Sequence, residues 1–371
     1  MATISLCMIV KNEEKLLKRC LDSIVDLVDE VIIVDTGSTD NTKAIAREYT
    51  SNVFDFEWVD DFSAARNFAF SKCTMEYIYV ADADEYLDEN NRFQFKILKE
   101  NLYSEIEIVQ MMYDTISNDT VLNVKREYRP KLFKRLREFV WINPVHETVR
   151  LDPLVFDSDV IVTHAPDGNH AKRDLSIFEK EIASSGRLSD ELIKMYACEL
   201  YRNGTIDDFN KAMNYFETIN DFDSLRNYDG EIAFTTKDYY SIFISVKWLR
   251  LKNDSKFEAY ASKACDLLEG SSEIYFELGQ FHLDNKQYEK AADLFCNAYN
   301  ATSKLDIHSG GDLALKNLIY CCEQVISDYN NYKATNGNDV KMETLISEYK
   351  EILNRYQIEL DKWEMPEEIL I

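Results

Sequence analysis

The chain has 371 residues, enough for two ordinary domains, and its 46% hydrophobic content can fill two cores. Its formal net charge of -25, from 67 acidic and 42 basic residues, disfavours nucleic acid and anionic membranes as partners, because both are bound by clustered Lys and Arg. Only 10 Gly and 5 Pro argue against disorder and against an all-β sandwich.

The first ten residues lack the charged start and the long apolar core of a signal peptide, and their pattern is typical of a strand. No stretch approaches the ~20 apolar residues of a membrane span. The 8 cysteines lie scattered in apolar patterns without a Cys-x-x-Cys pair, which favours reduced, core-filling thiols and disfavours zinc. These features predict a cytoplasmic protein.

The first half alternates strand and helix patterns. Apolar runs at 4–10, 30–35, 52–56 and 77–81 are typical of buried strands, and helical spacing or N-cap residues separate them. Repeated units of this length predict an α/β fold, with a parallel sheet covered by helices on both faces. Polar residues that follow the strands would then gather at one edge of the sheet, where such folds bind ligands.

Two aspartates, Asp82 and Asp84, follow the strand at 77–81. If the strand's period of two persists, both point to one side and Ala83 points to the other. Two converging carboxylates suit a hard divalent cation that keeps open positions for phosphate oxygens. The other interpretation is an acidic surface turn, because Asp-x-Asp often arises by chance.

Asp35 and Arg66 each have two interpretations as well. Asp35 would accept hydrogen bonds from a base N–H or a ribose hydroxyl, or it would open the turn before Gly37. Arg66, in the first turns of a helix, would reach a pyrophosphate or a sugar, or it would pair with an acid such as Asp61. The glycines form neither G-x-G-x-x-G nor a Walker loop, which disfavours a nicotinamide site and a P-loop.

Four segments resemble, in order and spacing, the signatures of the family 2 inverting glycosyltransferases with the GT-A fold: 7–14, 31–40, 61–67 and 81–85. The resemblance covers residues 1 to about 165, and the layout is similar to the sublancin S-glycosyltransferase subgroup. It implies a Rossmann-like, mostly parallel sheet, a nucleotide-sugar donor such as a UDP-sugar, and Mn²⁺ or Mg²⁺.

The resemblance also implies roles for individual residues. Asp84 would be the direct metal ligand, with Asp82 nearer the ribose and the metal. The residues that would line the uridine pocket or approach the donor are Val10, Asn12, Glu13, Asp35, Arg66 and Asn67.

Residues 103–165 would carry the acceptor side, with long strands predicted at 105–114 and 121–135. The second strand holds a basic run that would either counter a diphosphate, with Arg129 as a donor contact, or form a charged solvent face. This run comprises Arg126, Arg129, Lys131, Lys134 and Arg135.

The segment 143–147 resembles the family's His-Glu segment at the acceptor site. Glu147 would then be the base that deprotonates the nucleophile, with His146 beside it, and Asp152 or Asp157 are alternative bases. The strand at 160–164 ends in His164, where similar enzymes often have a metal-binding histidine. The alternative for His164 is a purely structural histidine.

From residue 171 the patterns are helical. Segments 201–216 and 278–295 repeat, and the second resembles a tetratricopeptide repeat (TPR). We expect a degenerate copy at 257–261 after an acidic insertion at 220–238, and capping helices at 313–326 and 342–356. The predicted domains are therefore a GT-A nucleotide-sugar-binding catalytic domain at 1–170 and an all-α, TPR-like repeat domain at 171–371. The repeats would bind a peptide or protein, or they would support a homo-oligomer or stabilise the chain.

These features predict a metal-dependent inverting glycosyltransferase that moves a sugar from a nucleotide donor to a peptide, protein or other acceptor. Two alternatives remain open. One is a saccharide-elongating transferase of cell-surface polysaccharide assembly. The other is a non-enzymatic TPR scaffold with a glycosyltransferase-like domain.

Overall fold

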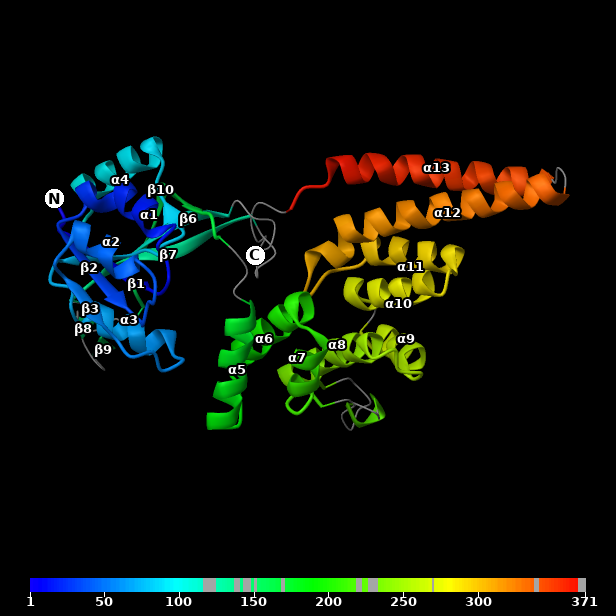
Figure 1. The fold of residues 1–371 in the computed structure, drawn as a ribbon, viewed down its shortest axis with the longest axis horizontal. Coiled ribbons are helices and arrows are strands. Elements are labelled where there is room, and N and C mark those ends of the chain that lie inside the picture. The colour runs from blue at the N-terminus through cyan, green and yellow to red at the C-terminus, as the bar shows by residue number, and fades with distance from the viewer. Residues whose placement is uncertain are drawn as a thin grey trace. The chain divides into compact units, whose positions relative to one another are not determined.

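The computed structural model describes residues 1–115, 125–136, 141–142, 148–149, 152–167, 171–217, 222–225, 233–268, 270–336 and 340–365. The chain divides into two compact units, 1–169 and 170–365. The first is α/β and the second is helical (Figure 1), which confirms the predicted fold class. That each unit folds as an independent domain, with the limits given above, stays a prediction.

The first unit is built on one sheet of eight strands in the order β3-β2-β1-β4-β7-β6-β10-β5, with β8 and β9 paired apart from it. The strands are β1 Ile4–Val10, β2 Glu30–Asp35, β3 Val53–Asp55, β4 Tyr77–Val80, β5 Glu85–Tyr86, β6 Ile108–Thr115, β7 Arg126–Lys134, β8 Trp141–Ile142, β9 Thr148–Val149 and β10 Val155–His164.

The sheet is mixed, whereas the strand–helix alternation predicted parallel pairing. Strands β1 to β4 do pair in parallel, so their carboxyl ends meet at one edge. By contrast, β7 lies antiparallel between β4 and β6, and β5 lies antiparallel to β10. The connection from β6 to β7 is too short for the crossover helix that a parallel pair requires, so the chain returns in the opposite direction.

Helices cover both faces of this sheet, as the sequence predicts. Along β1, Leu6 and Met8 pack into one hydrophobic cluster, whereas Cys7 packs into the other, because successive side chains of a strand point to opposite faces. The helices are α1 Leu17–Ile24, α2 Thr42–Tyr49, α3 Phe62–Phe70 and α4 Glu89–Asn101. The clusters include residues of α1 and α4 on one face and of α3 on the other.

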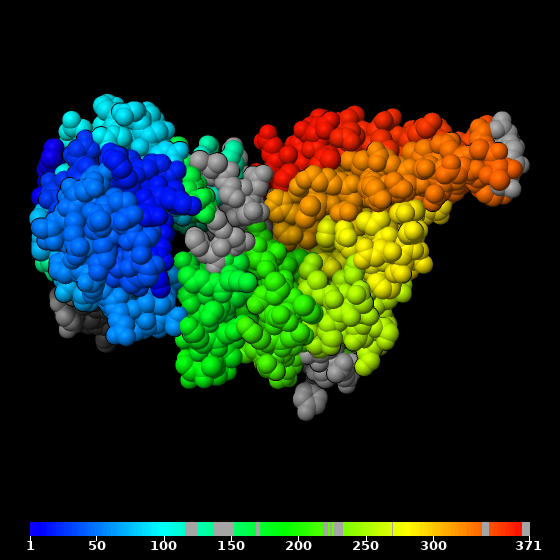
Figure 2. All heavy atoms as spheres, in the orientation of Figure 1, coloured from blue at the N-terminus to red at the C-terminus, as the bar shows by residue number. Residues whose placement is uncertain are grey.

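The second unit is a stack of helices. They are α5 Ala171–Ser185, α6 Asp190–Asn203, α7 Ile206–Ala212, α8 Thr236–Leu251, α9 Phe257–Leu267, α10 Ser272–Asp284, α11 Tyr288–Asn300, α12 Asp312–Asn336 and α13 Val340–Lys362. Most successive helices pack together, α6 packs against α8, and the long pair α12 and α13 lies side by side along its length (Figures 1 and 2). None of the helices described is long and apolar enough to cross a membrane.

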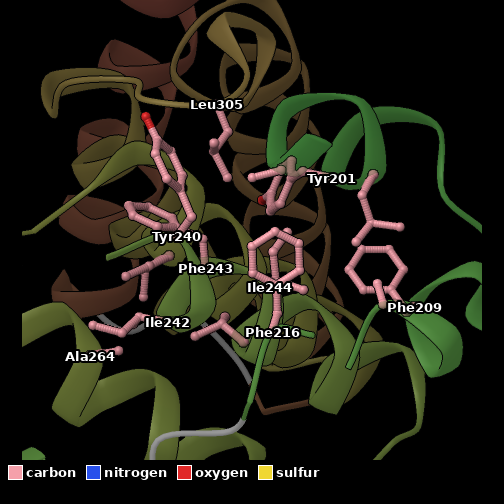
Figure 3. Packing of buried hydrophobic residues seen from close by; sticks show 14 of the residues in the cluster. Tyr201, Phe209, Phe216, Tyr240, Ile242, Phe243, Ile244, Ala264 and Leu305 are labelled. Carbon is pink, nitrogen blue, oxygen red and sulfur yellow. The ribbon is translucent and has the colours of Figure 1, made fainter. Parts of the chain in front are cut away.

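The interior of the stack is apolar and closely packed. Figure 3 shows side chains from different helices converging there, among them Tyr201 and Phe243. At Gly279 of α10, an added Cβ would lie 2.8 Å from the ring of Phe295 in α11, so a glycine allows these two helices to approach. This close approach is the packing that the TPR-like pattern predicts.

Candidate functional site

The acidic turn after β4 keeps the alternation of the strand. Ala81, Ala83 and Glu85 are buried, while Asp82 and Asp84 are partly exposed. The two aspartates therefore share a side of the chain and Ala83 takes the other, as the period of two predicts. This places both carboxylates at the carboxyl end of a central strand, the edge where α/β sheets bind ligands.

Strand β10 brings a histidine to the second aspartate. β10 pairs antiparallel with β5, and His164 lies opposite Glu85 in the register. As a result, His164 Nε2 lies 3.0 Å from Asp84 Oδ2. The imidazole stacks on Tyr113 with 5.0 Å between ring centroids, and its buried Nδ1 has no partner among the described residues. The structure therefore brings together two residues predicted as metal ligands, from positions 80 residues apart in the chain.

The first aspartate faces an arginine. Arg66 Nη2 lies 3.3 Å from Asp82 Oδ1, whereas Asp61 accepts the backbone N–H groups of Ser63 and Ala64 and caps α3. Arg66 thus pairs with an acid of the site rather than with Asp61. Burial raises the pKa of Asp82, but the charges of Lys131 and Arg66 outweigh it and leave this pKa below its ordinary value. Asp82 is therefore ionised at neutral pH, and Arg66 Nη1 stays buried without a partner in the described ranges.

A buried ion pair lies behind the two aspartates. Lys131 Nζ is 2.7 Å from each carboxylate oxygen of Glu85, and the two residues are only 5% and 1% exposed. Glu85 also accepts the backbone N–H of Asp82 at 3.2 Å. Burial raises the pKa of Glu85, and Lys131 partly offsets this while Asp82 adds to it. Sequence reasoning missed Glu85, although the same alternation places it on the buried side with Ala83, where an acid needs a partner.

The rest of the basic run on β7 is also held by protein groups. Arg129 lies over the ring of Tyr113, 3.8 Å from its centroid, and pairs with Glu127. Arg126 pairs with Asp114, and Lys134 and Arg135 donate to the backbone carbonyls of Ser104 and Met75. Lys131, which is buried, forms no part of a charged solvent face. The run mainly stabilises the sheet, and Arg129 contacts the same ring, that of Tyr113, on which His164 stacks.

For Asp35, the structure shows the turn, which is one of its two interpretations. Its Oδ1 accepts the N–H groups of Gly37 and Ser38 at 3.0 and 2.9 Å and so forms the turn. Its Oδ2 is buried and has no partner in the part of the chain that the structure describes. One oxygen is thus used by the fold, and a hydrogen bond from a base or a ribose to the other oxygen stays a prediction.

The other residues predicted for the uridine pocket surround this turn. Val10 is buried and lies opposite Asp35 in the β1–β2 register. Asn12 has a positive φ of 56° and accepts the N–H of Thr39, so it ties the loop after β1 to the loop after β2. Glu13 donates its backbone N–H to Thr42 Oγ1 at 2.6 Å. Asn67 is an exposed residue of α3 and directly follows Arg66 in the chain.

The predicted catalytic pair, His146 and Glu147, lies outside the described residues. Of the alternative bases, Asp157 is seven residues before His164 on β10, which corresponds to roughly 20 Å along an extended strand. Asp152 precedes β10 at the same far end. These positions disfavour both alternatives as the base, and Glu147 stays a prediction.

The residues present fit a divalent cation that is bound together with phosphate. Within the described ranges, no three His, Cys, Asp or Glu side chains gather to form a metal cage. Asp84 and His164 supply two converging ligands, with Asp82 on the same side. Mg²⁺ is typically held by one or two carboxylates plus substrate phosphates. Carboxylates also suit Mn²⁺, for which imidazole is a less usual ligand. The donor set therefore suits a cation that completes its coordination with a substrate.

With this geometry in place, comparison with known families identifies the first unit. Residues 5–149 match the model of the family described as Glycosyl transferase family 2. The chain carries a family 2 glycosyltransferase domain. This match confirms the resemblance predicted from the four motifs, and the matched range contains Asp82, Asp84 and the predicted base Glu147.

Three curated relatives are similar to parts of this chain. A TPR repeat-containing protein of Synechococcus elongatus is 38% identical over 161 residues, which are 40% of this chain and 36% of that protein. The glycosyltransferase SunS of Bacillus subtilis is 39% identical over 92 residues, 24% of this chain and 22% of its own. An uncharacterized glycosyltransferase of Rickettsia felis is 30% identical over 176 residues, 43% and 57% of the two chains. The chain thus spans less than two thirds of each relative.

Among solved structures, glucosyl-3-phosphoglycerate synthase from Mycobacterium tuberculosis is similar to the chain. Its complex with Mn²⁺, UDP and glucosyl-3-phosphoglycerate has a TM-score of 0.36 at 15% identity, over 51% of this chain and 81% of that one. Its complex with Mn²⁺, UDP and phosphoglyceric acid has a TM-score of 0.27 at 22% identity, over 30% and 43%.

Proposed function

We propose that this protein is a metal-dependent inverting glycosyltransferase that uses a nucleotide-sugar donor, a UDP-sugar, and a peptide or protein acceptor. The observation that carries the proposal is the convergence of Asp84 and His164, 3.0 Å apart, at the strand ends of a family 2 glycosyltransferase domain. A side-chain pair of this kind, next to the ionised Asp82, is suited to a cation and a diphosphate.

Each residue of the site has a separate task in this proposal. Asp84 and His164 would hold Mn²⁺ or Mg²⁺, which neutralises the charge that develops on the leaving diphosphate. Asp35 Oδ2, buried and unpartnered among the described residues, accepts a hydrogen bond from the base or ribose. Arg66, with Nη1 likewise free of a described partner, orients the donor through its diphosphate or sugar.

The proposed transfer is a direct displacement at the anomeric carbon. The acceptor atom forms a bond to this carbon from the face opposite the diphosphate, while the carbon–oxygen bond to the diphosphate breaks. Glu147 takes the proton from the acceptor. The second unit supports a peptide or protein acceptor, because arrays of stacked helical pairs form extended concave surfaces that bind such ligands.

The test replaces Asp84 by asparagine. Asp84→Asn is isosteric and removes the negative charge that a cation needs, so we expect the fold to persist and metal-dependent turnover of a UDP-sugar to fall about 10²-fold or more. Turnover is measured across a panel of UDP-sugars, as slow hydrolysis without acceptor and as transfer to peptides. Asp26→Asn, at an exposed acid that pairs with Arg92, is the matched control and should keep full activity. Wild-type activity that survives EDTA, together with an active Asp84→Asn variant, would contradict the proposal.

A further inference from the structure

A side chain of α1 reaches the backbone of both segments that carry the candidate metal ligands. Arg19 Nη2 donates to the carbonyl oxygen of Asp84 and to the carbonyl oxygen of Ala165, each at 3.1 Å. The guanidinium lies over the ring of Tyr86, 4.8 Å from its centroid. One nitrogen thus bridges two strand ends that are 81 residues apart in the chain, and an aromatic ring fixes the plane of the group.

The two bridged positions matter because of their neighbours. Asp84 is itself one candidate ligand, and Ala165 directly follows the other, His164. The backbone supplies one further link, from the N–H of Ala165 to the same carbonyl oxygen of Asp84 at 3.0 Å. The Arg19 guanidinium and the backbones of Asp84 and Ala165 are therefore joined by three hydrogen bonds. These bonds fix the backbone next to the Asp84 carboxylate and the His164 imidazole.

Two neighbours of Arg19 on α1 hold the same acidic turn. The Cys20 thiol lies 3.4 Å from the carbonyl oxygen of Asp82, and Ser23 Oγ accepts the N–H of Leu87 at 3.2 Å. The helix thus contacts the turn at its start and at its end. Arg19 differs from Cys20 and Ser23 because it alone of the three also reaches the segment after β10.

Other cations of this surface pair with carboxylates. Lys15, Lys18 and Arg92 do so at 2.8, 2.8 and 2.7 Å, and Arg92 also donates to the carbonyl oxygens of Asp22 and Ser23 in α1. Within the described residues, the hydrogen bonds of Arg19 go to neutral carbonyl oxygens instead. An arginine that donates hydrogen bonds to two carbonyl groups is suited to holding the backbone in place, since the N–H donors of its rigid guanidinium lie in one plane.

We propose that Arg19 is a positioning residue for the metal site: it holds Asp84 and His164 at the separation and orientation that a divalent cation requires. The proposal rests on the proposed function, because the cation is part of it. Arg19 touches neither donor nor acceptor in this role. It acts through the backbone of the two ligand segments, as residues beyond the first ligands commonly do in metal sites.

The test measures Mn²⁺ affinity in the full chain, by the electron paramagnetic resonance signal of free Mn²⁺ at saturating UDP. Arg19→Gln should weaken Mn²⁺ binding about 10- to 100-fold, the usual effect of losing an outer support of a metal ligand. Arg19→Lys should recover part of this loss, because an ammonium can reach a carbonyl but cannot bridge both in the stacked geometry. Lys18→Gln, at the adjacent exposed residue, is the matched control and should bind Mn²⁺ like the wild type.

Two further readouts separate positioning from damage to the fold. UDP affinity without metal and the melting temperature should be unchanged in Arg19→Gln, and kcat at saturating Mn²⁺ should stay within about twofold of the wild type while the Mn²⁺ concentration for half-maximal rate rises. Equal Mn²⁺ affinity in Arg19→Gln and the wild type would overturn the positioning role and leave the proposed function intact. A parallel loss of metal-free UDP affinity would overturn it as well. A wild-type chain that binds no Mn²⁺ with UDP would overturn the metal site itself.

Discussion

Removing the lysine of the buried ion pair behind the site should destabilise the first unit strongly. In Lys131→Met, the Glu85 carboxylate loses a partner that lies 2.7 Å from both of its oxygens, and both side chains are almost fully buried. Breaking a buried pair from one side typically costs about 3–5 kcal/mol, because the remaining charge is left uncompensated. For a unit of this size, 1 kcal/mol shifts the melting temperature by about 2–4 °C, so the expected loss is about 6–20 °C.

The loss should depend on pH in a defined direction. Burial already raises the pKa of Glu85, and Lys131→Met removes the positive charge that lowers it most, so this pKa rises further even though the backbone N–H of Asp82 still donates to the carboxylate. Protonated Glu85 carries no charge and is tolerated in the interior. The deficit of Lys131→Met should therefore be small at low pH and grow as the pH rises through the raised pKa, by at most about 1.4 kcal/mol per pH unit for one proton.

The assay is calorimetric unfolding of the full chain between pH 5 and pH 8, with the transition of the first unit recognised by its shift on adding UDP and Mn²⁺. The double variant Lys131→Met/Glu85→Gln is the key control, because it removes both charges while the glutamine oxygen can still accept the N–H of Asp82. We expect it to recover to within about 1–2 kcal/mol of the wild type. A double variant as unstable as Lys131→Met, or a loss of stability in Lys131→Met that does not depend on pH, would refute the electrostatic reasoning. The loss of stability would then come from the changed packing of the side chain.

Two further predictions concern the base and the helical stack. Glu147→Gln should keep UDP affinity and lose turnover about 10²- to 10⁴-fold, as measured by UDP titration and transfer assays, and loss of UDP binding would mean that Glu147 belongs to the donor pocket. Gly279→Ala should destabilise the second unit by about 1–3 kcal/mol, because its Cβ would meet the Phe295 ring at 2.8 Å, and an unchanged unfolding transition would show that the ring can move aside.

Much of the parallel part of the sheet could be predicted from local pattern. β1 and β2 have the predicted limits, and the turn after β4 keeps the predicted side for Asp82 and Asp84. Each of these features depends on periodicity within a few residues, which a sequence displays directly. The pattern also identified His164 as a residue at a strand end, although it left a structural role equally open.

The remaining features depend on contacts between distant segments. The antiparallel insertion of β7 follows from a short connection that strand patterns alone do not register. The basic run containing Lys131 was interpreted as a diphosphate site or a solvent face, because its partner Glu85 lies 46 residues away. Arg19 carries no local signal either, since an exposed arginine on a helix is the ordinary case and its carbonyl partners belong to every residue type.

The alternation of side chains between 81 and 87 makes the length of this segment as important as its composition. A single inserted or deleted residue before Asp82 would exchange the two faces, since side chains of extended chain alternate one by one. Both aspartates would then enter the core, and Glu85 would leave Lys131 alone in the interior. Point substitutions at the outward positions change chemistry while the fold persists, but a change of length by one residue removes the chemistry and the fold together.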